Sequence, residues 1–396
     1  MKLLIISHTP HYCRGEEIVG WGSTVQEIDS LARLFDEIWH IACTYTSKAP
    51  NSALRYESNR VKLIRVPPAG GTSFRDKLGI LRLAPSYVRV ILRELPKADV
   101  VHVRCPANIS LIAVILLAFV RKPRIRWVKY AGNWSPNIKD SWSYRLQRWW
   151  LNRKLHQGVV TINGRWPNQP SHVHSFLNPC LSQVEVEEAR IEARNKRLNS
   201  PVHLLFVGYI NENKGLGIAL QTAERLRAQG ISLIFDIVGD GYERTKYEQL
   251  AGELGLNDVV RFHGWIPRTQ IGGFYQSAHF LLLPTDSEGW PKVVSEAMAY
   301  GVIPIVSKVS SIPQVLAEIG CGLALSRDSE QAFVDGVKVY LDNPRRWQDE
   351  TERGRNFANQ FTYEEYGLAL DRMFQKAWGI SLLSNRTMGQ MSDIGQ

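Results

Sequence analysis

Short apolar runs alternate with stretches of helical periodicity along most of the chain. In the first half the apolar runs lie at Leu3–Ser7, Ile38–Cys43, Val61–Val66, Val100–Val103, Ile125–Tyr130, Val159–Ile162 and Val173–Leu177. In the second half they lie at Leu204–Val207, Leu233–Val238, Val259–Phe262, Phe280–Leu283, Ile303–Val306 and Leu323–Leu325. Because this alternation is typical of parallel strands joined by crossover helices, the pattern predicts an α/β protein with two doubly wound, Rossmann-like domains.

The expected domain boundary lies near residue 199. Residues 184–199 are dense in Glu, Arg, Lys and Asn and lack apolar periodicity, so we expect a linker or a charged helix there. The first domain is expected over 1–199, including that linker, and the second over 200–378. A helical pattern begins near Trp347, and the polar residues 379–396 are expected to form a frayed tail.

The composition is that of an ordinary globular chain. Of 396 residues, 44% are hydrophobic and 22% charged, and this length is more than one core needs. The five cysteines are scattered without a C-x-x-C pair, so neither a disulfide framework nor a zinc site is indicated. The first residues resemble a strand more than a signal peptide, and Cys105–Val120 is shorter than the roughly 20 residues of a spanning helix. We therefore expect a cytoplasmic protein.

The positive charge is concentrated in the first half of the chain. The net charge is +10 overall, and residues 1–199 contain 30 Lys and Arg against 15 Asp and Glu. Two helical segments, Ser73–Leu95 and Ser141–Leu155, are both basic and aromatic. They suit the headgroup zone of an anionic membrane, and they also suit aromatic packing with solvated charges opposite. No nucleic-acid-binding motif is present, so we do not expect nucleic acid as a partner.

The stretch Leu281–Gly301 is the most informative part of the sequence. A short apolar run is followed by a turn-rich loop, and Pro291 fits the start of a helix that Gly301 ends. Glu288 and Glu296 then stand eight positions apart, the first in the loop and the second in the second helical turn. Both would line the crevice at the carboxyl ends of the strands, where open α/β sheets bind ligands.

A second loop of interest follows the first strand. It contains Gly15, Gly20 and Gly22 and precedes a helix that Ser23 or Thr24 could cap. Exposed amide groups at such a helix start can face an anion, although the spacing is not G-x-G-x-x-G. An ordinary flexible turn is the alternative.

These motifs together resemble one enzyme family. Glu288, Gly289, Glu296 and Ala297, followed by Gly301, Pro304 and Pro313, resemble the E-x7-E signature of retaining GT-B glycosyltransferases, in particular glycosyltransferase family four. The resemblance covers most of residues 202–316 and is thinner in the first half. It implies two domains facing across a cleft and a C-terminal helix that crosses back to the first domain.

The resemblance also implies roles for individual residues. Glu288 and Lys214 would carry the chemistry at the donor sugar and its leaving diphosphate, and Glu296 would bind the ribose. The remaining donor-binding residues by resemblance are Gly20, Gly22, Gly208, Gly239, Asp240, Trp265, Ile266, Gly289, Trp290, Lys292 and Val293.

The sequence departs from the family pattern at two places. Tyr209 stands where an Arg usually follows the first glycine of the strand–loop at Gly208. Lys292 could substitute in part for that cation, and a surface pair with Glu296 one turn on is the alternative for it. The loop after Ile125–Tyr130 lacks the usual His, so Asn133 or the backbone at Gly132 would take its place. His102 and Arg104 are further candidates for acceptor contact, and core or salt-bridge roles are equally open for them.

We therefore expect a retaining glycosyltransferase that moves a sugar from a nucleotide-diphosphate donor to a saccharide or lipid-linked acceptor. The expected setting is synthesis of envelope polysaccharide, lipopolysaccharide or glycolipid, with peripheral contact to the inner face of an anionic cytoplasmic membrane. No cofactor and no metal are expected, because no D-x-D motif is present and His172 and His174 lack companion ligands. The alternatives are a sugar-nucleotide epimerase or hydrolase of the same fold and a catalytically silent scaffold.

Overall fold

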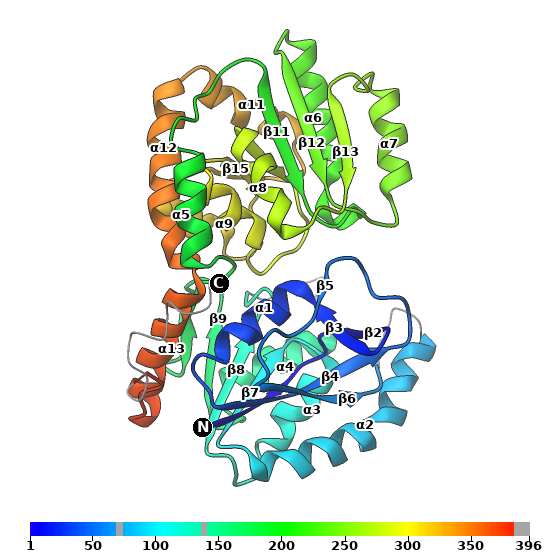
Figure 1. Cartoon of the computed structure of the whole chain (residues 1–396), viewed down its shortest axis with the longest axis vertical. Coiled ribbons are helices and arrows are strands. Elements are labelled where there is room, and N and C mark those ends of the chain that lie inside the picture. The colour runs from blue at the N-terminus through cyan, green and yellow to red at the C-terminus, as the bar shows by residue number, and fades with distance from the viewer. Residues whose placement is uncertain (69–73, 136–140, 384–396) are drawn as a thin grey trace. The chain divides into compact units, whose positions relative to one another are not determined.

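The chain folds into two α/β units, which we describe separately. The computed structural model describes residues 1–68, 74–135 and 141–383. The first unit comprises residues 1–176 and 363–396, and the second comprises residues 177–362 (Figure 1). The predicted fold class, two domains built on parallel sheets, is confirmed.

The first unit is built on a largely parallel sheet. Within the described residues, the order of its main strands is β10-β9-β8-β7-β1-β4, with β6 pairing on β4, and all these pairs are parallel. Three short strands, β2, β3 and β5, extend it beside β4. The strands are β1 (Lys2–Ile6), β2 (His11–Arg14), β3 (Glu17–Trp21), β4 (Glu37–Tyr45), β5 (Ala53–Leu54), β6 (Val61–Val66), β7 (Val100–Cys105), β8 (Ile125–Tyr130), β9 (Val159–Ile162) and β10 (Val173–Ser175).

Helices cover both faces of this sheet. Leu3 and Ile5 of β1 belong to a buried cluster with α1 (Gly22–Leu31) and α13 (Tyr363–Trp378). Leu4 and Ile6, the alternate residues of the same strand, belong to a second cluster with α2 (Phe74–Glu94), α3 (Asn108–Leu116) and α4 (Trp142–Asn152). Because successive side chains of a strand point to opposite faces, one apolar run supplies both cores.

The second unit contains a six-stranded parallel sheet among its described residues. Its strand order is β13-β12-β11-β14-β15-β16, and Figure 1 labels β11, β12, β13 and β15. The strands are β11 (Val202–Val207), β12 (Leu233–Val238), β13 (Val260–Gly264), β14 (Phe280–Leu283), β15 (Ile303–Ser307) and β16 (Leu323–Leu325). The helices are α5 (Gln183–Glu192), α6 (Leu216–Ala228), α7 (Arg244–Glu253), α8 (Arg268–Ser277), α9 (Lys292–Ala299), α10 (Ile312–Ile319), α11 (Glu330–Leu341) and α12 (Pro344–Phe357).

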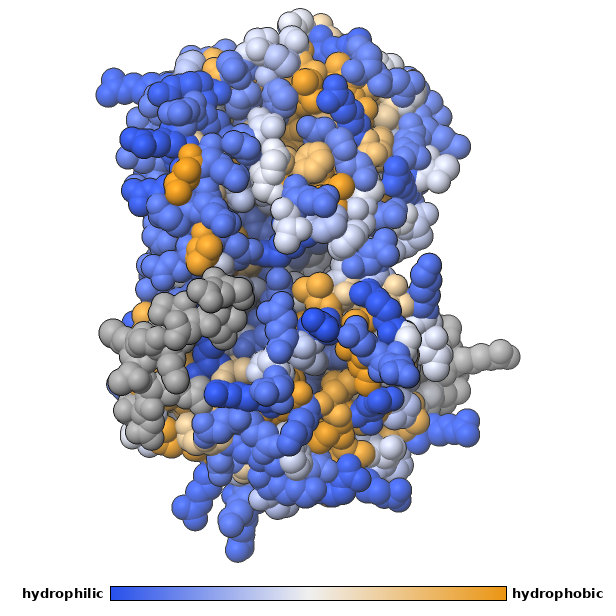
Figure 2. Space-filling view, in the orientation of Figure 1, coloured by the Kyte–Doolittle hydropathy of each residue, from blue (hydrophilic) through white to orange (hydrophobic). Residues whose placement is uncertain are grey.

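The surface is mixed in character. On the face seen in Figure 2, hydrophobic residues lie in small groups among hydrophilic ones on both units, as expected where protein meets water. None of the described helices is both long enough and apolar enough to span a bilayer.

The predicted linker is part of the second unit. Residues 183–192 form α5, which begins with a capping box between Ser182 and Glu185. Its residues Val186 and Ala189 are buried in the core of the second unit. The unit boundary therefore precedes the predicted linker, because two buried apolar side chains are enough to dock this largely charged helix.

The C-terminal helical stretch is divided between the units. The helix α12 packs in the second unit, and a 3-10 turn over Ala358–Phe361 separates it from α13. The helix α13 belongs to the first unit, where Phe374 contacts Phe35 and Trp127 edge to face. The predicted return of the last helix to the first domain is confirmed, and residues 384–396 of the predicted tail lie outside the described residues.

Candidate functional site

The carboxyl ends of the second unit's strands gather most of the predicted site residues. All six strands run parallel, so their last residues and the loops that follow lie along one edge of the sheet. Glycines end three neighbouring strands here, namely Gly208 after β11, Gly239 after β12 and Gly264 in β13. The Gly239 amide donates to Gly264 O at 2.8 Å, and the Gly208 amide donates to Val238 O at 3.0 Å.

Gly239 is required by close backbone packing. Its φ is +137°, and a Cβ there would lie 1.8 Å from Gly208 O. No other residue fits this conformation and this approach. The next residue, Asp240, is exposed, and its carboxylate accepts the Gly241 amide at 2.8 Å. The turn that holds the predicted residues Gly239 and Asp240 is thus a tight backbone crossing with a carboxylate beside it.

Lys214 lies at the end of a short 3-10 turn after β11. The turn spans Glu212–Lys214, and the Asn211 side chain accepts the Lys214 amide at 3.2 Å. Gly215 follows with φ +73° and starts α6. A Cβ on Gly215 would lie 2.0 Å from Pro284 O, so this glycine lets the Lys214 turn lie against the loop after β14.

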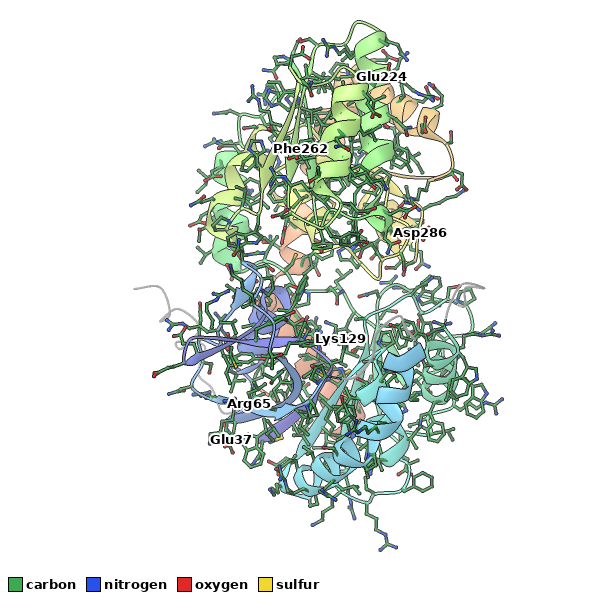
Figure 3. The ribbon with its side chains drawn as sticks, turned by 90° about the vertical axis from the view of Figure 1, so that its right-hand side faces the viewer. Glu37, Arg65, Lys129, Glu224, Phe262 and Asp286 are labelled. Atoms are coloured by element: carbon green, nitrogen blue, oxygen red, sulfur yellow. The ribbon has the colours of Figure 1, made fainter. Side chains whose placement is uncertain are left out.

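Two hydrogen bonds hold these loops together. The Asp286 amide donates to Asn213 O at 2.7 Å, and the Thr285 hydroxyl donates to the same oxygen at 3.2 Å. Asp286 is labelled in Figure 3, in the loop that follows β14. The strands β11 and β14 are neighbours, so residues 72 positions apart in sequence share one loop cluster.

Lys214 and Glu288 form an ion pair across these loops. The Lys214 ammonium contacts Glu288 Oε1, and the two side chains are 27% and 16% exposed. Both charges therefore remain in reach of solvent and of a ligand. The structure brings together the two residues to which the sequence assigns the chemistry.

Glu296 is held by a different set of partners. It lies in the second turn of α9, as predicted, where its Oε1 accepts Arg268 Nη1 at 2.9 Å and its Oε2 accepts the Tyr275 hydroxyl at 2.8 Å. Burial and the neighbouring Glu296 carboxylate raise the pKa of Tyr275 well above its usual value, so its hydroxyl stays a donor. The sequence did not identify Arg268 or Tyr275, although Arg268 lies two residues after the predicted donor-binding residue Ile266.

The loop between Glu288 and α9 is anchored in the core. Trp290 is 5% exposed, donates from Nε1 to Ser295 Oγ at 2.8 Å and stacks on Phe361. Its ring is therefore a core side chain that fixes the loop, and a donor contact at Trp290 would have to use its backbone. Gly289 accepts the Ser311 hydroxyl through its carbonyl at 3.1 Å. Lys292 and Val293 form the first turn of α9, where amide groups are not used within the helix.

Several aromatic side chains remain exposed at the same edge. Trp265 follows β13 and is 37% exposed, and Ile266 beside it is partly buried. Tyr209 and Tyr242, after β11 and β12, are 47% and 75% exposed with ring centroids 6.1 Å apart. The residue that departs from the family pattern thus belongs to an exposed tyrosine pair.

A cation that the sequence did not identify also lies at this edge. Arg327 follows β16, pairs with Asp286 at 3.1 Å, and donates to Pro284 O at 3.0 Å and to Glu212 O at 2.8 Å. It therefore joins the loops after β11 and β14. No local sequence pattern indicates this role. It depends on the order of the strands in the sheet, where β16 is two strands away from β14.

The predicted glycine loop of the first unit has a different structure. Gly20 lies in β3, which pairs with β2 as an antiparallel hairpin, and a Cβ on Gly20 would lie 2.5 Å from His11 Nε2. Gly22 is buried at the start of α1, where a Cβ would lie 2.4 Å from Ser52 O. The open loop predicted here is wrong, because strand pairing and close packing require both glycines. No side chain caps α1, so the predicted Ser23 or Thr24 cap is also wrong.

The two acceptor-side candidates on β7 are internal residues. His102 is fully buried and stacks on Trp127 with ring centroids 3.6 Å apart. Burial, and to a lesser extent Arg104, lowers the pKa of His102 well below its usual value, so the ring is neutral. Arg104 binds Glu27 of α1 through two hydrogen bonds, of 2.7 and 3.3 Å. The structure thus contradicts the predicted acceptor contact of His102.

Glu27 also binds a second cation. Lys129 of β8, labelled in Figure 3, contacts Glu27 Oε1 at 2.6 Å, and both side chains are at most 5% exposed. The Lys129 ammonium lies 5.2 Å from the ring centre of Tyr366 on α13. This buried charge cluster joins the sheet to α1 and α13, and it accounts for Arg104 as a structural residue.

Asn133 occupies the loop after β8, as predicted. It is partly exposed, its side-chain oxygen accepts the Ser135 amide at 3.0 Å, and its carbonyl accepts Arg148 Nη1 at 3.3 Å. Among the described residues, no group of three or more His, Cys, Asp or Glu side chains is arranged to hold a metal.

Comparisons with known proteins identify the family. The model of the glycosyl transferases group 1 matches residues 187–357. An uncharacterized glycosyltransferase of Haemophilus influenzae is 30% identical over 293 residues, covering 71% of this chain and 76% of the relative. The amylovoran biosynthesis glycosyltransferase AmsK of Erwinia amylovora is 30% identical over 214 residues, covering 50% of this chain and 51% of AmsK. The chain thus spans only about half the length of this second relative.

A solved structure shows the same fold. HepE from Anabaena, crystallised with UDP and glucose, superposes with a TM-score of 0.67 at 14% identity, covering 95% of this chain and 100% of HepE. The fold is therefore GT-B, and the chain belongs to the group 1 glycosyltransferases. The family predicted from the sequence is confirmed, and with it the class of enzyme.

Proposed function

We propose that this protein is a retaining glycosyltransferase that moves a hexose from a nucleotide-diphosphate donor to a saccharide or lipid-linked acceptor. The observation that carries the proposal is the Lys214–Glu288 ion pair at the carboxyl edge of the second sheet. A carboxylate that can bind sugar hydroxyls lies against an ammonium that can bind a diphosphate. Glu296, one turn into α9, would bind the ribose of the same donor through the acceptor sites that Arg268 and Tyr275 leave on its carboxylate.

Charged and polar groups of this chain would stabilise the leaving diphosphate. As the bond from the anomeric carbon to the phosphate oxygen breaks, negative charge grows on the diphosphate. Lys214 and the first amides of α9, at Lys292 and Val293, would meet this charge. The acceptor oxygen attacks from the side of the leaving group, and its proton passes to the departing phosphate. The proposed reaction uses no metal and no organic cofactor.

The setting that we propose is assembly of an envelope polysaccharide or glycolipid at the cytoplasmic face of a membrane. The name of the amylovoran relative supports a polysaccharide product. UDP-glucose is the first donor to test, because HepE was crystallised with UDP and glucose. The base and the sugar of the true donor are to be found by screening.

A transfer assay tests the proposal. The protein is incubated with UDP-glucose and other nucleotide sugars, with and without a panel of oligosaccharides and polyprenyl-linked sugars. We expect nucleotide release only when an acceptor is present, and NMR of the product should show the donor's anomeric configuration. Release without acceptor would indicate a hydrolase, inversion would refute the retaining mechanism, and donor binding without any release would indicate a silent scaffold.

A further inference from the structure

The surplus positive charge of the chain lies in one segment of the first unit. Residues 100–176 contain twelve Lys and Arg and a single acid, Asp140. The rest of the chain has 36 Lys and Arg against 37 Asp and Glu, so it is nearly neutral. The segment includes α3 and α4. A surface formed by these helices therefore has few carboxylates to neutralise its bases.

The exposed face of α4 alternates aromatic rings and bases. Trp142, Arg145, Trp149 and Arg153 recur at helical spacing and are all exposed, whereas Gln147, Arg148 and Leu151 are buried. Trp142 is 74% exposed and Trp149 is 48% exposed. The Arg153 guanidinium lies 5.1 Å from the centre of the Trp149 ring. Indole rings of this exposure are unusual on a surface that faces only water.

The turn after α3 continues this surface. Phe119 is 78% exposed, and Arg121, Lys122 and Arg124 just after it are exposed. The helix α4 packs against α3, because Trp150 Nε1 donates to Val114 O at 3.0 Å. Just beyond α4, Gln157 Nε2 donates to Ala118 O at 3.0 Å. The helix α4 and the turn after α3 thus lie side by side, and together they present exposed aromatic rings among basic side chains. We call this surface the α3–α4 face; it consists of Trp142, Arg145, Trp149, Arg153, Phe119, Arg121, Lys122 and Arg124.

We propose that the α3–α4 face docks on a bilayer rich in anionic phospholipid. Aromatic rings enter the boundary between headgroups and acyl chains, while Lys and Arg remain at the level of the phosphates. Phe119 has no hydrogen-bonding atom, so only an apolar environment stabilises its burial. This favours a lipid partner over nucleic acid, because Lys and Arg side chains in a polar groove would be enough to bind nucleic acid. The proposal goes beyond the proposed sugar transfer and does not require it.

Vesicle binding by the whole chain tests the proposal. The protein is sedimented with vesicles of phosphatidylcholine alone and of phosphatidylcholine mixed with phosphatidylglycerol. We expect binding to the anionic vesicles only, and weaker binding at high salt. Arg145→Glu with Arg153→Glu should lower the partition coefficient at least roughly 30-fold, since each base near such a surface contributes about a fivefold factor. Trp142→Ala with Trp149→Ala should lower it roughly tenfold or more.

Matched control variants lie outside the face. Lys48→Glu with Arg190→Glu changes the net charge equally at two exposed positions, and Val184→Ala with Ile191→Ala removes two exposed apolar side chains of α5. All variants should keep the melting temperature of the unmodified protein, because the substituted side chains are exposed. Both control pairs should bind vesicles like the unmodified chain.

Four results would overturn the proposal. They are equal binding to neutral vesicles, undiminished binding by the α3–α4 variants, an equal loss in the controls, and tighter binding of duplex DNA or RNA through the same residues. Vesicle binding needs neither donor nor acceptor. A negative transfer assay therefore leaves this test intact, and a failed vesicle test leaves the transfer assay intact.

Discussion

Gly215→Ala tests whether the contact between the Lys214 turn and the loop after β14 builds the site. The alanine Cβ would lie 2.0 Å from Pro284 O in a residue whose φ is +73°. The left-handed backbone alone costs an alanine roughly 1–2 kcal/mol. The overlap is with backbone, so the loops must separate and lose the two hydrogen bonds to Asn213 O, each worth about 1 kcal/mol. We expect a total loss of roughly 3–4 kcal/mol in the free energy of unfolding.

The same substitution should weaken donor binding. If Lys214 moves with its turn, a charge-assisted hydrogen bond to the diphosphate is lost, which corresponds to roughly a tenfold or larger loss of affinity. Calorimetric titration with UDP or with the donor found by screening measures this. Urea unfolding of the whole chain measures the stability change.

Gly230→Ala is the matched control. Gly230 has φ +82°, but nothing lies within 4 Å of a Cβ placed there. It should lose only the roughly 1–2 kcal/mol of the backbone conformation and bind the donor normally. If Gly215→Ala is no less stable than Gly230→Ala and binds the donor equally well, the loop contact is not what positions Lys214.

Three further predictions follow from other contacts. Lys214→Met should reduce donor affinity roughly tenfold or more while changing stability little, as measured by titration and thermal unfolding; unchanged affinity would refute its phosphate role. Glu27→Ala should cost roughly 3–5 kcal/mol in urea unfolding, because Arg104 and Lys129 stay buried without their carboxylate; a loss below 1 kcal/mol would contradict this. Burial lowers the pKa of His102 below its usual value of 6.5, so stability that is present above pH 6.5 is lost as the pH falls, by about 1.4 kcal/mol per pH unit. His102→Phe should show a slope of unfolding free energy against pH that is shallower by that amount. An unchanged slope would contradict this.

The sequence was most informative where structure depends on local signals. The strand, loop and helix over Leu281–Gly301 follow from an apolar run, a proline at the helix start and a glycine after its end, all within 21 residues. Both acidic residues lie in the predicted elements. The two-unit α/β fold follows in the same way from the alternation of apolar runs.

The sequence was misleading where tertiary pairing decides the structure. Nothing local to Gly20 indicates that it pairs with His11 and must remain small beside that ring. His102 is a polar residue inside the apolar run Val100–Val103, where a core role and a ligand contact are both open, and the stack on Trp127 shows the core role. Glu27 and Lys129 are about 100 residues apart, so their contact depends on how β8 and α1 pack.

The two charge clusters differ in their capacity for ligand exchange. Around Glu27, the carboxylate and Lys129 are almost fully buried, so a ligand anion could enter only by leaving a charge unpaired in the interior, which costs several kcal/mol. The Lys214–Glu288 pair is partly exposed, so water can solvate both charges when the pair opens, and opening costs less than it does at Glu27. Opening it is therefore cheap, and a diphosphate can take the place of the Glu288 carboxylate at Lys214 while Glu288 turns to the sugar hydroxyls. The partial exposure that makes the second pair weak as a structural contact makes it suitable for binding a donor.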